Sequence, residues 1–271
     1  MNKPAAAAIL ISQLFFAGLY SLHSESDKQP AKKNSPVNQQ IPQIQRLNKV
    51  KSKVVIIIDD VGAEMTHFSE LTNVPGKLTV SILPGEKFSK ISAEIAHQKG
   101  FEVMLHQPMQ PRNIVENRIG SGGIFVSMPP LVVEKILSEN ISNIPYVKGV
   151  NNHMGSYATT KPLVMRAMMN VLKAKKLYFV DSLTSGSSKG YSIAVEMGVK
   201  TLKRDIFIDT VDGYDYAVKQ LRQLKRIAKN KPVSVAIGHC RLHTINALKK
   251  ILPEFEKDDI QVSKVSEVFS E

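Results

Sequence analysis

The chain has 271 residues, of which 43% are hydrophobic and 22% charged, a composition typical of a globular body and not of a disordered or fibrous protein. A single cysteine, Cys240, excludes an internal disulfide framework and a multi-cysteine zinc site, so a metal would need histidine and carboxylate ligands. The net charge of +12 fits either a solvated basic surface or attraction to anionic envelope polymers or lipid headgroups. The chain has no tryptophan and no interleaving of basic and aromatic residues, so the sequence does not indicate nucleic-acid binding.

The N-terminus carries a targeting signal. Residues 1–23 place Lys3 before an apolar run of about eighteen residues, which predicts a secretory signal peptide or an uncleaved signal anchor. Lys3 favours a cytoplasmic N-terminus, so we expect the body to be exported to the periplasm or the outer face of the cytoplasmic membrane. Membrane contact would then come only from this segment, if it is not cleaved. Residues 24–52 are polar with three prolines and predict a disordered linker, so the folded domain spans 53–271.

From residue 53 apolar strands alternate with amphipathic helices. The pattern predicts helices at 87–100, 162–176 and 215–230, with Met165, Met168 and Met169 at core spacing in the second. It predicts strands at residues 54–58, 78–83, 101–105, 149–150, 177–180, 205–208, 233–237 and 260–262. Such alternation predicts one α/β domain with a mostly parallel sheet. Seven or eight strands favour a complete or distorted (β/α) barrel over a small open sheet.

Aspartate and histidine residues stand at the carboxyl ends of several predicted strands. The strand ends carry Asp59, Asp60, His106, His153, Asp181, Asp209 and His239. The carboxyl ends of parallel strands meet at one edge of a sheet, so we expect these side chains to gather there. Imidazoles with a carboxylate are ligands that suit a catalytic zinc or a similar divalent ion. The alternative is a set of buried groups that fasten loops by hydrogen bonds.

Six ordered motifs carry a family resemblance. IIIDDVG, HQPMQP, GVNNHMGS, YFVDS, KRDIFID and VAIGHCRLHT resemble the divergent polysaccharide deacetylases of the bacterial envelope, distant relatives of NodB-type carbohydrate esterases. The resemblance implies a distorted (β/α) barrel, a divalent ion held by Asp and two His, and hydrolysis of N-acetyl groups on sugars. It makes Asp60 the carboxylate ligand and His106 an imidazole ligand. The second NodB histidine is replaced by Gln110, so His153 is the substitute, with zinc the first choice among Zn, Co, Ni and Mn.

The remaining strand-end residues receive roles in a hypothetical hydrolysis. Asp59 would act as general base on a water molecule, and His239 as general acid toward the leaving amine. Asp181 or Asp209 would orient His239 and favour its charged form. Arg241 either pairs with one of these acids or lies on the surface.

The sequence thus predicts a metal-dependent hydrolase that removes N-acetyl groups from a cell-envelope polysaccharide or a peptidoglycan glycan. The alternative is a non-catalytic metal- or glycan-binding envelope protein on a degenerate deacetylase fold. A third reading, a structural partner in a wall-processing complex, rests only on the leader and linker. Cys240, where the family usually has proline, is interpreted as a packing residue in preference to a reactive thiol. The glycan and the oligomeric state stay open.

Overall fold

The computed structural model describes residues 52–270, so the predicted leader and nearly all of the predicted linker lie outside the described residues. Within 52–270, no helix combines the length and apolar character needed to cross a bilayer. The strands are β1 Lys53–Val61, β2 Thr79–Ile82, β3 Glu102–Met109, β4 Val147–Met154, β5 Tyr178–Asp181, β6 Thr201–Lys203, β7 Ile206–Phe207, β8 Val233–His239 and β9 Gln261–Ser263. The helices are α1 Thr66–Leu71, α2 Ser89–Gln98, α3 Pro130–Asn143, η1 Ala158–Thr160 (a 3₁₀ turn), α4 Pro162–Lys175, α5 Gly190–Glu196, α6 Tyr214–Ala228, α7 Leu242–Lys257 and α8 Val265–Val268.

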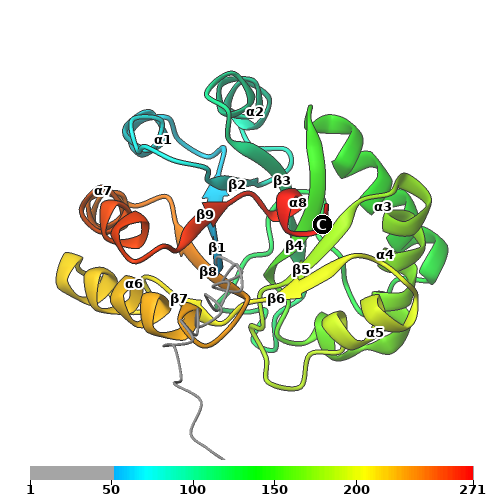
Figure 1. Cartoon of the computed structure of the whole chain (residues 1–271). Coiled ribbons are helices and arrows are strands. Elements are labelled where there is room, and N and C mark those ends of the chain that lie inside the picture. Colours follow the sequence, from blue (N-terminus) through cyan, green and yellow to red (C-terminus); the bar gives the residue numbers. More distant parts are fainter. Residues whose placement is uncertain (1–51, 271) are drawn as a thin grey trace, which may run out of the picture. The chain divides into compact units, whose positions relative to one another are not determined.

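The strands form one parallel sheet that curls into a half-barrel. Its order is β6-β5-β4-β3-β2-β1-β8-β7, and β9 pairs with the first residues of β1. Lys203 pairs with Asp181 of β5, and Ile206 pairs with Ala236 of β8, so a short stretch of chain connects the two edges of the sheet. Helices α1 to α7 surround the strands, and α8 lies near the middle of the ring (Figure 1). The predicted distorted (β/α) barrel is confirmed.

The predicted strands all have counterparts, and most differ from them at their ends. The largest difference is at β4, which extends from Val147 to Met154 where only residues 149–150 were predicted. The prediction ended at residue 150 because the polar residues Asn151 and Asn152 interrupt the apolar run. Both are nevertheless buried in the sheet. The segment 201–203 was missed: β6 carries a lysine and no buried residue, so it lacks the apolar run that indicates a strand.

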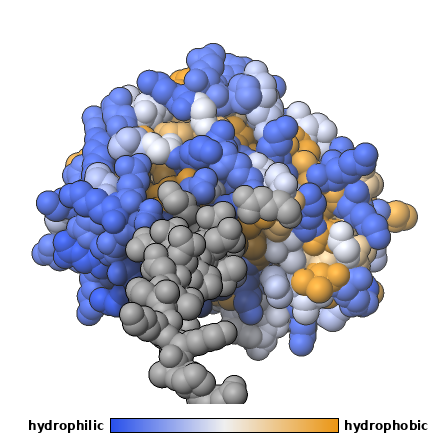
Figure 2. Space-filling view, in the orientation of Figure 1, coloured by the Kyte–Doolittle hydropathy of each residue, from blue (hydrophilic) through white to orange (hydrophobic). Residues whose placement is uncertain are grey.

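Two apolar cores stabilise the fold. The larger core lies between the sheet and the outer helices and includes Met165, Met168 and Met169, which are fully buried as predicted. The smaller core fills the inside of the half-barrel, where Ile57 and Ile237 pack with Val265 of α8. Burial of these side chains stabilises the fold through the hydrophobic effect. On the face seen in Figure 2 hydrophilic side chains predominate, and apolar ones occur in small groups.

Candidate metal centre

The end of β1 brings two adjacent carboxylates to the same place. Neighbouring residues of a regular strand point to opposite faces. Here the pairing of β1 with β2 shifts between Ile58 and Val61, and Asp60 has a φ of 60°, in the left-handed region. As a result, Oδ2 of Asp59 and Oδ1 of Asp60 lie 3.5 and 3.2 Å from the same atom, Nε2 of His106. Gly62, with a φ of 117°, then turns the chain off the strand.

Three side chains from three strands converge at this point. Oδ1 of Asp60 lies 3.2 Å from Nε2 of His106 and 3.0 Å from Nδ1 of His153, and these two nitrogens are 3.2 Å apart. The three atoms therefore form a nearly equilateral triangle, one ligand atom from each residue. Ligands about 2.0 Å from a tetrahedral zinc ion are separated by about 3.3 Å, so the triangle fits such an ion.

The polar environment of the triangle also fits a cation. Oδ1 of Asp60 is buried and accepts no hydrogen bond of good geometry from the described residues, although two imidazoles face it. Burial would raise the pKa of the Asp60 carboxyl, but His106 and His153 outweigh burial and hold its pKa well below the ordinary value. Burial likewise opposes the charged form of His106, yet Asp59 and Asp60 raise its pKa to about 8. The site thus attracts positive charge, and a divalent ion would supply it.

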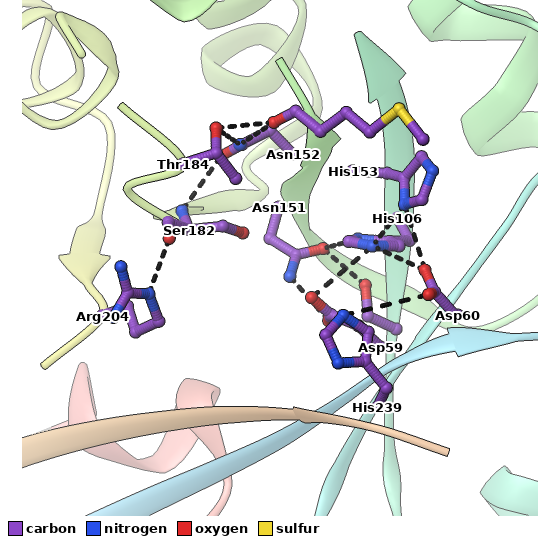
Figure 3. A network of polar contacts seen from close by, with 12 residues as sticks. Asp59, Asp60, His106, Asn151, Asn152, His153, Ser182, Thr184, Arg204 and His239 are labelled. Atoms are coloured by element: carbon purple, nitrogen blue, oxygen red, sulfur yellow. Dashed lines mark hydrogen bonds and ion pairs between the residues drawn. The ribbon is translucent and has the colours of Figure 1, made fainter. Parts of the chain in front are cut away.

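Asn151, fully buried on β4, connects the triangle to Asp59 (Figure 3). Its Oδ1 lies 2.7 Å from Nδ1 of His106 and accepts a hydrogen bond from the Ser81 hydroxyl. Its Nδ2 donates to Oδ1 of Asp59 at 2.8 Å. Because an amide oxygen only accepts, Nδ1 of His106 must carry a proton, so in the neutral imidazole the Nε2 lone pair faces the triangle. Desolvation raises the pKa of Asp59 despite the opposing effect of His106 and His239.

A histidine–carboxylate pair borders the triangle on the β8 side. His239 pairs in register with Asp59, and its Nε2 lies 3.9 Å from Oδ2 of Asp60. Nδ1 of His239 lies 2.9 Å from Oδ1 of Asp209, while Oδ2 of Asp209 accepts the His239 backbone N–H and the Thr244 hydroxyl. Burial opposes protonation of His239, but Asp209 outweighs it and raises the pKa of the imidazole. Burial would raise the pKa of Asp209, and its bonds with His239 lower it.

Of the two acids proposed as partners of His239, only Asp209 contacts the imidazole. The carboxylate of Asp181 instead accepts hydrogen bonds from the backbone of Leu183 and Tyr191 and from the Ser188 hydroxyl. These donors belong to the loop that follows β5 and to the first turn of α5. The expected contact of Asp181 with His239 is therefore corrected: Asp181 fastens its own loop because the alternation of β5 turns the carboxylate away from the inside of the barrel.

Three further residues that the sequence singled out have structural contacts. Oε1 of Gln110 accepts the Val126 backbone N–H at 2.9 Å, so the residue that replaces the second NodB histidine fastens a loop. Arg241 is exposed and donates to the Asp209 carbonyl oxygen at 3.4 Å, not to a carboxylate. Cys240 packs against the larger core, and burial raises the pKa of its thiol to about 12, which favours the packing interpretation.

Sequence reasoning overlooked the residues that hold the site in place. Asn151 stands two residues before His153 in the motif GVNNHMGS, and Thr244 follows His239 on the next turn. The only signal for Asn151 was weak: it directly follows the predicted strand at 149–150, where a buried amide would need hydrogen-bonding partners.

The fold and site define a NodB-like α/β half-barrel with a candidate centre for a divalent ion at its strand ends. The chain belongs to the divergent polysaccharide deacetylase family, whose model matches residues 56–269. A protein of Haemophilus influenzae is 33% identical over 77% of this chain and 74% of its own length. YibQ of Escherichia coli K12 is 30% identical over 81% of this chain and 68% of its own length. Neither relative has a characterized activity.

Solved structures confirm the fold. A protein of Agrobacterium tumefaciens superposes with a TM-score of 0.78 at 19% identity, covering 82% of this chain and 90% of its own. A candidate cellobiose-phosphate cleavage protein of Enterococcus faecalis gives a TM-score of 0.55 at 15% identity, over 80% and 99% of the two chains. At these identities the similarity concerns the fold alone.

Proposed function

We propose that the chain is a metal-dependent deacetylase that acts outside the cytoplasmic membrane and removes N-acetyl groups from a cell-envelope polysaccharide or a peptidoglycan glycan. The observation that carries the proposal is the triangle of ligand atoms from Asp60, His106 and His153. A carboxylate, Asp59, and an imidazole, His239, lie beside it, with Oδ2 of Asp59 3.5 Å from Nε2 of His106 and Nε2 of His239 3.9 Å from Oδ2 of Asp60. The family supports the reaction class, and the predicted leader supports the compartment.

Asp60, His106 and His153 would hold the ion, for which zinc is the first choice. When bound, a divalent ion of this kind polarises a carbonyl oxygen and lowers the pKa of water. Three protein ligands leave a coordination position open, as in catalytic and not structural zinc sites. The Ser81–Asn151–His106 chain of hydrogen bonds would keep the second imidazole nitrogen aimed at the ion.

Asp59 would act as the general base. Asn151 fixes Oδ1 of Asp59, whereas Oδ2 lies 3.5 Å from Nε2 of His106 and therefore faces the ligand triangle. Burial raises the pKa of this carboxyl, which brings its proton affinity closer to that suited to a base at neutral pH. Oδ2 is thus the atom that would receive the proton of the attacking water.

His239 would act as the general acid. Asp209 binds Nδ1 of His239 and leaves Nε2, on the side of Asp60, as the atom that gives up a proton. Because Asp209 raises the pKa of His239, a larger fraction of the imidazole is protonated at neutral pH. Nε2 would deliver its proton to the amine that leaves with the sugar.

The test is acetate release from chitooligosaccharides and peptidoglycan fragments by the purified chain, with and without added zinc and chelator. We expect zinc-dependent release that Asp59→Asn reduces at least about a hundredfold with zinc still bound. Asp60→Ala and His106→Ala should both lose stoichiometric zinc. His67→Ala is the matched control, because the His67 side chain is 44% exposed and pairs with Glu64, outside the triangle.

The outcomes separate the proposal from its alternative. Zinc and glycan binding without any acetate release would refute the deacetylase and support a non-catalytic binding protein on the same fold. Retention of zinc by both Asp60→Ala and His106→Ala would refute the metal centre itself.

A further inference from the structure

Arg204 is an arginine inside the mouth of the half-barrel without a carboxylate partner. It is partly buried, and among residues 52–270 no carboxylate oxygen lies within ion-pair distance of its guanidinium. Asp181 and Asp205 interact electrostatically with the guanidinium from a greater distance, but both carboxylates already have other partners. Asp181 is bound by its own loop, and Asp205 is bound by Nζ of Lys231 at 2.7 Å. A partly desolvated cation left in this state is costly, unless an anion binds it.

The contacts of Arg204 fix its orientation and leave one edge free. Nε donates to the Ser182 carbonyl at 2.7 Å (Figure 3), and Nη2 donates to the Leu183 carbonyl at 3.1 Å. One face of the guanidinium lies 3.7 Å from the centre of the Phe207 ring. The edge formed by Nη1 and the second Nη2 hydrogen makes no hydrogen bond with the described residues. Two parallel N–H groups of this kind match the two oxygens of a carboxylate.

The loop that orients Arg204 is held in a strained conformation. Leu183, whose carbonyl accepts the Nη2 hydrogen bond, has a φ of 47°, which an L-residue with a bulky side chain rarely adopts. Its backbone N–H is bound by the buried carboxylate of Asp181. Strain of this type persists only where the surroundings impose it, and it concentrates at ligand-binding positions.

Arg204 lies close to the candidate active site. The Phe207 ring, on which the guanidinium packs, is nearly parallel to the His239 imidazole, with 6.3 Å between ring centres. Together the two separations place the guanidinium carbon within about 10 Å of the imidazole that would act as general acid. A disaccharide could therefore reach both side chains at once.

We propose that Arg204 is a subsite for a carboxylate of the glycan substrate, which makes the substrate an acidic glycan such as one that bears a lactyl carboxylate on an N-acetylhexosamine. The proposal rests on the deacetylase function proposed above and adds to it the class of substrate. Phe207 supports the guanidinium from one face, the carbonyls of Ser182 and Leu183 hold one edge, and the substrate carboxylate takes the free edge.

Equilibrium binding of a matched pair of ligands tests the subsite without requiring turnover. The first ligand is the disaccharide of N-acetylglucosamine and N-acetylmuramic acid, and the second is the same disaccharide with its lactyl carboxylate converted to a methylamide. Calorimetry with the zinc-loaded chain should show that the carboxylate form binds at least about tenfold more tightly, as expected for a bidentate arginine–carboxylate pair. Arg204→Gln should abolish that preference, and Arg204→Lys should retain only part of it.

Arg166→Gln is the matched control, because it removes the same charge from an exposed arginine paired with Glu196 on α5. It should bind both disaccharides as the unmodified chain does. Equal binding of both forms by the unmodified chain would overturn the subsite, even if Arg204→Gln fails to fold. A preserved preference in a folded Arg204→Gln variant would also overturn it.

A third ligand, with a phosphate monoester in place of the lactyl group, tests the anion class. Tighter binding of the phosphate form than of the carboxylate form would overturn the assignment to a carboxylate. Acetate release from neutral chitooligosaccharides reports on the deacetylase function separately, so failure of that function is distinguishable from failure of the subsite.

Discussion

Replacing Asn151 by alanine is the substitution that most directly tests how the site is organised. The change removes the oxygen that accepts the proton on Nδ1 of His106 and the N–H that donates to Oδ1 of Asp59. It also leaves the Ser81 hydroxyl without its acceptor. The ligand triangle itself is left intact, so its three ligand residues can still bind an ion, but His106 loses the contact that sets its tautomer and orientation.

The expected effect on metal binding follows from that lost contact. Removing a hydrogen-bonding partner of a ligating histidine typically weakens metal binding about 10- to 100-fold. That change corresponds to about 1.4 to 2.7 kcal/mol of binding free energy. The Asp59 carboxylate, only 2% exposed, loses a donor at the same time, so we expect the free energy of unfolding to fall by about 1–3 kcal/mol as well.

Asn151→Asp separates the two halves of the amide. One oxygen of the new carboxylate still accepts from Nδ1 of His106, so zinc affinity should stay close to that of the unmodified chain. The other oxygen would replace a donor that lies 2.8 Å from Oδ1 of Asp59. Two unit charges at this distance repel by about 6 kcal/mol at an effective dielectric constant of 20. The two carboxylates would therefore share a proton, and acetate release should fall although zinc is bound.

Competition with a chromogenic chelator measures the zinc affinity of each variant. Asn152→Ala is the control, because Asn152 is the adjacent buried asparagine of β4 and its bonds go to the Met154 carbonyl, the Ser182 N–H and the Thr184 hydroxyl. It should lose stability without a comparable loss of zinc affinity. The reasoning is wrong if Asn151→Ala binds zinc as tightly as the unmodified chain.

Three further substitutions test neighbouring conclusions. Asp209→Asn removes the carboxylate that raises the pKa of His239, so the alkaline limb of the pH profile of kcat/KM should move to lower pH; an unchanged limb would exclude His239 as the acid. Gln110→Ala should lower the free energy of unfolding by about 1–3 kcal/mol in urea titrations while zinc content stays constant, because Gln110 fastens a loop and does not bind the ion. Gly149→Ala should lower the free energy of unfolding by about 1–3 kcal/mol, since the new methyl group would collide with the Tyr178 ring; an unchanged melting temperature would contradict the close packing.

The parallel half-barrel and the positions of the site residues could be predicted because both follow from periodicity. Continuous apolar runs mark strands buried on both faces, and the carboxyl ends of such strands share one edge. That rule predicts that Asp60, His106 and His153 gather at one edge of the sheet. It could not separate Asp209 from Asp181, because both follow short apolar strands in the same way. The two acids differ in the face of the sheet toward which the side chain points. That face depends on the strand register, which the apolar pattern does not show.

Polar residues inside the sheet were beyond prediction for a related reason. Asn151 lies in β4 between Val150 and Asn152, and a sequence pattern does not distinguish an exposed asparagine from a buried one with three partners. The three partners lie on β1, β2 and β3, and only the folded sheet brings these strands close to β4. Buried amides of this kind are retained because their partners satisfy them, which requires the complete tertiary structure.

The conformation of Asp60 explains how adjacent carboxylates come to share one site. In a regular strand Asp60 would face the outer helices, where a charged carboxylate has no partner. The left-handed φ of 60° costs about 1–3 kcal/mol in a residue other than glycine, and the register shift after Ile58 gives up regular pairing with β2. Glycine at position 60 would adopt this turn without strain but could not contribute a ligand atom. In the proposed metal centre, an ion bound by Oδ1 of Asp60 and the two imidazole nitrogens within 3.2 Å of it would repay this strain.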